Sequence, residues 1–250
     1  MTMDPILSAA AAIPAALLLY YVWKADRLEK ESPRLLASLV LCGIGATLIA
    51  LALEWLGGAL LDALLDSRSV TYLALENFLV VAGAEEGAKY FVMKRRTWRS
   101  PEFNCQFDGV VYAVFVSLGF ALLENLHYVA AYGFGTAVVR AVTAVPGHAC
   151  FGVFMGTWYG SAKRCQALGR RGEAAACRMM ALVLPMFLHG SYDFIASADE
   201  PLFSLIFVIF VAVMFVVAFI LVRTLSRRDR YLDLHGRSEP WSRPPWDPWR

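Results

Sequence analysis

The sequence is short of the groups that build compact secreted or metal-binding domains. Its five cysteines include no CxxC pair, which argues against a disulfide framework and against a cysteine-zinc site. There is no HExxH motif, so a zinc site cannot be inferred from local spacing. Only 18% of the 250 residues are charged and the formal net charge is +2, so no nucleic-acid partner is expected.

The sequence is instead rich in apolar residues. Hydrophobic residues make up 58% of the chain and the mean hydropathy is +0.53. A bilayer-spanning helix needs about 20 predominantly apolar residues. We therefore predict an all-α polytopic membrane protein with about seven transmembrane helices, at residues 6–23, 35–53, 72–93, 107–132, 137–160, 179–196 and 202–222.

The basic residues predict the orientation of these helices, because Lys and Arg collect on the cytoplasmic side of a membrane. Twenty of the 23 lie in alternate connections and in the carboxy-terminal segment; the others are Arg68, Lys89 and Arg140. The amino terminus is thus expected outside and the carboxy terminus in the cytoplasm. Asp4 and the lack of a preceding basic residue favour a membrane anchor over a cleaved signal peptide in the first segment.

Two parts of the chain differ in composition. Residues 1–225 are predicted to form one integral membrane helical bundle. Residues 226–250 are rich in Arg, Pro and Trp and have no apolar period, so we expect a cytoplasmic tail that is disordered or lies on lipid headgroups.

The most informative polar residues are two adjacent carboxylates, Glu85 and Glu86, inside the third apolar segment. A carboxylate at the centre of a spanning helix costs roughly 2.5–3.5 kcal/mol, so such residues normally face a polar site. Lys89 follows them by four and three residues and can contact either one. One base would neutralise only one acid, and the second carboxylate therefore suggests a functional role.

The fourth segment carries Glu124, Asn125 and His127 near its outer end. Glu124 and His127 form an ExxH pair, but a di-iron site would need a second copy, which the sequence lacks. At 1.5 Å per residue, Glu124 is about 25 Å from the cytoplasmic end of its helix and Glu85 about 13 Å from the end of its own. Helix tilt or a later helix start must bring them to one depth. His127 is interpreted as an interfacial residue.

Two further segments each carry a histidine near their middle. His148 follows Pro146 and precedes glycines at four-residue intervals, a close-packing pattern that directs the imidazole into the bundle. His189 and Asp193 are four residues apart, so the carboxylate can orient the histidine or join it at a metal. We expect these residues and the glutamates to converge on one buried site.

Four ordered motifs carry a resemblance to a known family. EEGAK at 85–89, FALLEN at 120–125, HACFG at 148–152 and HGSYD at 189–193 resemble the motifs of PrsW, a multi-pass bacterial intramembrane protease. Membership in the wider group that includes CAAX prenyl proteases is implied. The resemblance also implies a single-span membrane protein substrate such as an anti-sigma factor.

The residue chemistry is consistent with peptide hydrolysis, which needs an activated water and a group that stabilises the oxyanion. Zinc held by His148, His189 and Glu124 would leave an open position for water. Glu85 or Glu86 would be the general base, and the other carboxylate, with Asn125 and Asp193, would orient ligands and substrate. A metal-free glutamate–histidine mechanism uses the same residues.

Two other classes of function fit the same residues. In a proton- or cation-coupled transporter the buried carboxylates and histidines would form a relay, although the halves of the chain show no convincing repeat. A catalytically silent scaffold would use the glycines to bind single-span partners. The Ala- and Arg-rich composition fits a bacterial plasma membrane.

Overall fold

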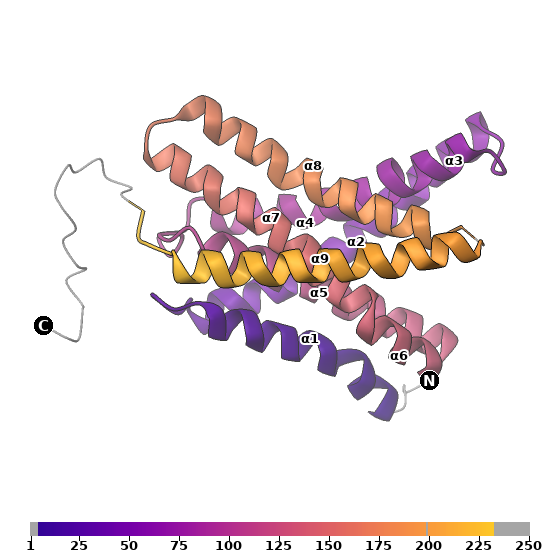
Figure 1. Ribbon diagram of the computed structural model, residues 1–250, viewed down its shortest axis with the longest axis horizontal. Helices are drawn as coiled ribbons and strands as arrows, with labels where there is room; N and C mark the ends of the chain where they lie inside the picture. The colour runs from indigo at the N-terminus through magenta and orange to yellow at the C-terminus, as the bar shows by residue number, and fades with distance from the viewer. Residues whose placement is uncertain (1–4, 199, 233–250) are drawn as a thin grey trace, which may run out of the picture.

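The computed structural model describes residues 5–198 and 200–232 (Figure 1). These residues form a bundle of helices running back and forth along one direction, with a single isolated bridge between Cys105 and Tyr231. The elements are α1 (Pro5–Ala25), α2 (Pro33–Leu64), α3 (Val70–Leu75), the π-helix η1 (Glu76–Val81), α4 (Ala82–Thr97), α5 (Asp108–Tyr132), α6 (Phe134–Val142), α7 (Ala144–Ala167), α8 (Arg171–Ala196) and α9 (Pro201–Arg227).

The all-α membrane architecture is confirmed. Five helical stretches of the described chain are long and apolar enough to span a membrane: Pro33–Leu64, Asp108–Tyr132, Phe134–Ala167, Arg171–Ala196 and Pro201–Arg227. The two other predicted spans coincide with α1 and with the continuous run α3–η1–α4, which carries several charged residues. The count of seven and the orientation stay predictions.

Two predicted segments contain local breaks. The third passes through η1, a π-helical stretch of the kind that often lies at functional sites. The fifth is divided at Thr143, three residues before Pro146, whose ring would clash with the carbonyl of the residue four positions earlier. Gly133, with a φ of 82° and a ψ of −166° that glycine adopts readily because it has no Cβ, ends α5 and turns the chain into the short helix α6.

Helix α5 lies at the centre of the bundle, and every residue from Asp108 to Ala121 is buried. Because lipid is as apolar as the helices, close packing and not exclusion of water holds such helices together. The predicted glycine face of α7 packs directly on α5: a Cβ atom added to Gly156 would lie 2.4 Å from the carbonyl oxygen of Gly109. On the other side of α5, a Cβ atom added to Gly119 would lie 2.3 Å from the carbonyl oxygen of Val40 in α2.

The two ends of the bundle differ in charge. The basic end carries the α1–α2, α4–α5 and α7–α8 connections and the carboxy-terminal end of α9; the opposite end carries α3, α6 and the start of α9 (Figure 1). At the basic end, residues 226–232 contact the bundle: Asp229 Oδ1 accepts from the Phe107 N–H at 3.0 Å. The rest of the predicted tail, residues 233–250, lies outside the described residues.

Candidate active site

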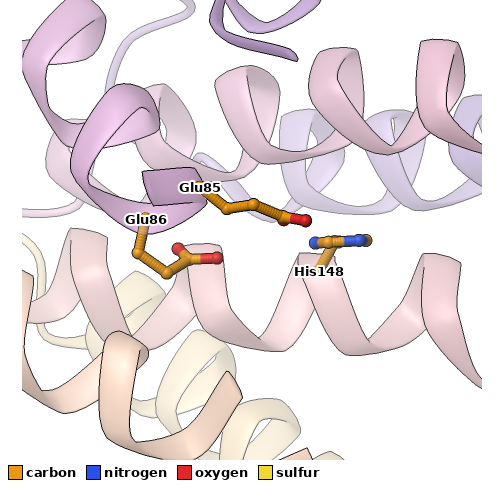
Figure 2. Close-up of side chains that lie close together, drawn as sticks. All are labelled: Glu85, Glu86 and His148. Carbon is orange, nitrogen blue, oxygen red and sulfur yellow. The ribbon is translucent and has the colours of Figure 1, made fainter. Parts of the chain in front are cut away.

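Glu85 and Glu86 lie on α4 with their side chains directed toward the space between α4, α5, α7 and α8. Figure 2 shows the Glu85 carboxylate pointing at His148 of α7, with the Glu86 carboxylate turned toward the same region. Glu86 is fully buried, and Glu85 and His148 are 7% and 4% exposed. The three side chains are therefore largely shielded from solvent and lipid.

Lys89 joins these groups through its ammonium, which is completely buried. Its Nζ donates to Glu85 Oε2 at 2.9 Å and to Glu86 Oε1 at 2.8 Å, and lies 3.1 Å from His148 Nδ1. The same ammonium is 3.9 Å from the centre of the Phe120 ring. Since an ammonium can only donate, Nδ1 of His148 must accept, and the proton of the neutral imidazole sits on Nε2.

The Nε2 atom of His148 faces Glu124 of α5, whose Oε2 lies 2.7 Å away. Arg140 of α6 approaches the same oxygen at 3.0 Å through Nη2, and its Nε donates to Asn125 Oδ1 at 3.0 Å. Asn125 in turn donates to the carbonyl of Ala11 in α1 at 2.9 Å. Glu124 is thus held between an imidazole and a guanidinium.

His189 of α8 lies between two carboxylates. Its Nδ1 is 3.0 Å from Glu86 Oε1, and its Nε2 is 3.2 Å from Asp193 Oδ2. Because ionised carboxylates only accept hydrogen bonds, both ring nitrogens donate and the imidazole carries a positive charge. The ring stacks on Phe151 with centroids 4.6 Å apart and lies 5.4 Å from the His148 ring.

A cavity of about 1010 Å³ reaches this cluster from the opposite end of the bundle. Glu85, Glu124, His148, His189 and Asp193 line it, whereas Glu86 and Lys89 do not. The two adjacent glutamates are thereby distinguished, because Glu85 faces the cavity and Glu86 lies behind it against Lys89 and His189. The rest of the wall is largely aromatic and apolar and includes His127, Tyr128, Tyr132, Tyr192 and Phe207.

All the residues singled out from the sequence meet in this region. Glu85 and Glu124 also differ less in their distance from the basic end of the bundle than the predicted helix ends implied. Helix α4 continues to Thr97 and not Met93, so Glu85 lies about 18 Å from the end of its helix. Glu124 lies about 24 Å from the start of α5.

Sequence reasoning missed two charged residues of the site. Arg140 enters the sequence analysis only as one of three basic residues outside the basic segments, and that unusual position is the signal that could have found it. Glu54 lies beyond the predicted end of the second segment, but α2 continues to Leu64 and places it on the cavity wall. There it is close enough to Glu85 and Glu124 for electrostatic repulsion.

The donor set fits a metal ion in composition. Among the described residues, ligand atoms of Glu85, Glu86 and His148 all lie within 4.8 Å of one another, and carboxylates with imidazole are a usual set for zinc. One oxygen of Glu86, Oε2, is buried and has no hydrogen-bond partner in the described chain. The predicted ligands His148, His189 and Glu124 are not among the groups of three clustered ligand atoms found in the described residues. Both nitrogens of His189 face carboxylates and offer no lone pair.

Comparison with known proteins gives a consistent result. Residues 31–222 match the sequence model of the PrsW family intramembrane metalloproteases. The chain is 35% identical to Protease PrsW of Geobacillus kaustophilus over 198 residues, which cover 79% of this chain and 82% of that protein. It is 32% identical to Protease PrsW of Oceanobacillus iheyensis over 213 residues, 85% of this chain and 92% of the relative. No solved structure matches the chain.

Proposed function

The chain belongs to the PrsW family of intramembrane metalloproteases, and we propose that it hydrolyses a peptide bond of a membrane-anchored protein with Glu85 as the general base. The observation that carries this assignment of the base is the position of Glu85 on the cavity wall, beside His148 and within 2.9 Å of Lys89. A base must reach the water that it activates. Glu86 has no such access, since its side chain is fully buried.

The neighbouring charges have separate tasks in this proposal. Lys89 and Glu86 hold Glu85 and His189 in place from behind the cavity wall. His189 and Arg140 put positive charge on the wall, where it stabilises the negative charge that develops on the scissile carbonyl oxygen. Glu124 fixes the orientation and tautomer of His148.

Of the three clustered side chains of Glu85, Glu86 and His148, we propose that Glu86 and His148 are ligands of a zinc ion and that Glu85 stays uncoordinated as the base. A bound metal would supply a Lewis acid and lower the pKa of a coordinated water. The Lys89 ammonium is in contact with all three side chains, so it must withdraw when an ion binds. Lys89 would then keep the carboxylates paired whenever the ion is absent.

The cavity also indicates where a substrate is cut. Its walls come from the halves of α2, α5, α7 and α8 that lie toward the opposite end of the bundle. With the predicted orientation, this end faces the outside. We propose that the substrate is a single-span protein such as an anti-sigma factor, cleaved near the outer end of its transmembrane segment in a bacterial plasma membrane.

The test is proteolysis of a tagged single-span substrate by purified enzyme in liposomes. We expect Glu85→Gln to lose at least about 100-fold in cleavage rate, since general base catalysis contributes roughly 10²–10⁴-fold. Glu173→Gln, at a well-exposed position on α8, is the matched control and should cleave like the wild type. Full cleavage by Glu85→Gln would remove this residue from catalysis.

The metal is tested separately from the base. Chelator-treated protein should lose cleavage and recover it with zinc, and His148→Ala should hold less metal than the wild type. A transporter would instead move protons or cations through vesicles without cleaving, and a silent scaffold would give neither signal. Cleavage that persists in metal-free protein would favour the glutamate–histidine mechanism without an ion.

A further inference from the structure

A second cluster of candidate metal ligands lies at the basic end of the bundle, away from the active-site cavity. It brings together the thiol of Cys105, in the α4–α5 connection, and the carboxylates of Asp108, at the start of α5, and Asp229, just after α9. One ligand atom from each lies within 4.8 Å of the other two. Cys105 and Asp108 are 1% and 2% exposed.

Backbone hydrogen bonds hold the two carboxylates in place. Asp108 Oδ2 accepts from the N–H groups of Asn104 at 3.0 Å and Cys105 at 2.7 Å. Asp229 Oδ1 accepts from the N–H of Phe107 at 3.0 Å. These bonds account for one oxygen of each residue, but Asp229 Oδ2 is buried without a hydrogen-bond partner in residues 5–198 and 200–232.

Asp26, in the α1–α2 connection, gives an independent indication. It is 2% exposed, and neither of its carboxylate oxygens has a hydrogen-bond partner in the described part of the chain. It lies close enough to Asp229, Asp108 and Cys105 to interact with each electrostatically. An ionised carboxylate buried without a partner is costly, so these three clustered carboxyl groups must either keep their protons or be compensated by a positive charge such as a bound cation.

The nearby lysines do not supply this charge by direct contact. Lys30 directs its ammonium to the backbone carbonyls of Trp23 and Asp26 and lies over the Trp23 ring. Lys163 donates to the carbonyl of Trp98 at 2.8 Å. Within the described residues, no ion pair joins Asp26, Asp108 or Asp229 to a basic side chain. The Lys and Arg ion pairs of this part of the chain involve other carboxylates.

We propose that Cys105, Asp108 and Asp229 bind a divalent transition-metal cation of the zinc type, with Asp26 as the fourth ligand or its closest charge partner. A thiolate with carboxylates selects such an ion over calcium or magnesium, which take oxygen ligands alone. Binding releases the Cys105 proton to solvent. The ion would tie the segment after α9 to the α4–α5 connection and to α5, the central helix.

This site is separate from the catalytic one. Asp108 is the first residue of α5, and Glu124 lies about 24 Å further along the helix axis. The catalytic candidate ligands contain no cysteine. A thiolate signature in a metal complex therefore reports on the basic end alone, and the proposal stands or falls independently of the protease mechanism.

The experiment is titration of the detergent-purified full-length chain with Co²⁺, which gives a thiolate-to-cobalt charge-transfer absorption only where a cysteine is a ligand. We expect this absorption to saturate at one equivalent of thiolate-bound cobalt in the wild type and to vanish in Cys105→Ser. Asp26→Asn should weaken binding by about 10- to 100-fold. A variant that keeps Cys105 as its only cysteine is the matched control, since it removes Cys165 and Cys177, and it should retain the absorption.

A second readout separates ligation from damage to the fold. Zn²⁺ should raise the unfolding temperature of His148→Ala, whose active site is disabled, but not that of His148→Ala combined with Cys105→Ser or with Asp229→Asn, and the unfolding of these double variants must remain cooperative. Absence of the absorption in the wild type would overturn the proposal. So would absorption that survives in Cys105→Ser, because Cys165 and Cys177 would then be its source.

Discussion

At the scale of single residues, the active site holds several charged side chains inside a membrane protein, where a buried charge without a partner is costly. The four carboxylates of Glu85, Glu86, Glu124 and Asp193 are paired with three cationic groups, those of Lys89, Arg140 and the doubly donating His189. Removing one member of a buried ion pair leaves its partner uncompensated, which costs far more than the pair contributes. A substitution of one charged residue here should therefore also disturb the ionic partner that stays in place.

Arg140 is the residue for which this expectation is most specific. Arg140→Gln removes the guanidinium from Glu124 and Asn125, so Glu124 loses the restraint that aligns His148. We expect cleavage to fall by about 10- to 100-fold, as for other residues that orient a ligand. The measurement is the cleavage rate in liposomes, beside Arg164→Gln in the last turn of helix α7. Equal rates for the two variants would contradict a positioning role.

Glu31, in the α1–α2 connection, makes a prediction about pH. Burial raises the pKa of its carboxyl to about 8, and nearby Glu102, Asp26 and Glu29 act in the same direction, while the hydrogen bond from Tyr112 at 2.8 Å opposes the shift. The folded protein thus keeps a proton that the unfolded chain releases above its ordinary pKa of about 4.5. The stabilisation is complete below that value and is lost as pH rises toward 8.

The measurement is the unfolding temperature in detergent and chelator between pH 4.5 and 9. For the wild type we expect a decline toward pH 8, at most about 1.4 kcal/mol per pH unit from this group. Glu31→Gln, which stays neutral, should have a flatter profile over the same interval. Parallel profiles for the two proteins would show that Glu31 does not titrate there.

At the scale of helices, the sequence allowed the correct assignment of most elements because an apolar run of 20 residues has few alternatives to a spanning helix. Glu85, His148 and His189 could also be assigned to one site because they lie at a similar depth in their predicted segments, whereas Glu124 was expected to lie higher. The contact between Lys89 and His148 could not be predicted, because it depends on how α4 and α7 face each other. Glu54 was missed because the predicted segment ends one residue before it, at position 53, whereas α2 continues through mostly apolar residues to Leu64.

The glycine contacts of α5 provide a test at this scale. A methyl group on Gly156 would overlap the backbone of Gly109 and Val110, so Gly156→Ala must push α7 away from α5 and move His148 relative to Glu124. Overpacking of this kind typically costs about 1–3 kcal/mol. We expect a lower unfolding temperature and reduced cleavage. Gly45→Ala, at a helical position with nothing within 4 Å of the added atom, should have neither defect.

At the scale of the whole molecule, the cavity and the basic residues lie at different ends. The cluster of Lys and Arg in alternate connections predicts which end faces the cytoplasm. The cavity approaches the catalytic groups from the other end, where Ser197 lies on its rim. If the prediction is right, a substrate enters from the membrane or from outside, and its cut releases the part of the protein beyond the membrane.

The orientation can be measured with single cysteines in an otherwise cysteine-free chain, labelled in intact cells by a membrane-impermeant maleimide. Ser197→Cys should react in intact cells, and Arg170→Cys, exposed in the α7–α8 connection, should react only after lysis. Thr2→Cys tests the helix count, since seven spans put it outside with Ser197. If Thr2→Cys instead reacts only after lysis while Ser197→Cys reacts in intact cells, then α1 or the α3–η1–α4 run does not cross the membrane. The cavity would then still open outward, but with six spans around it.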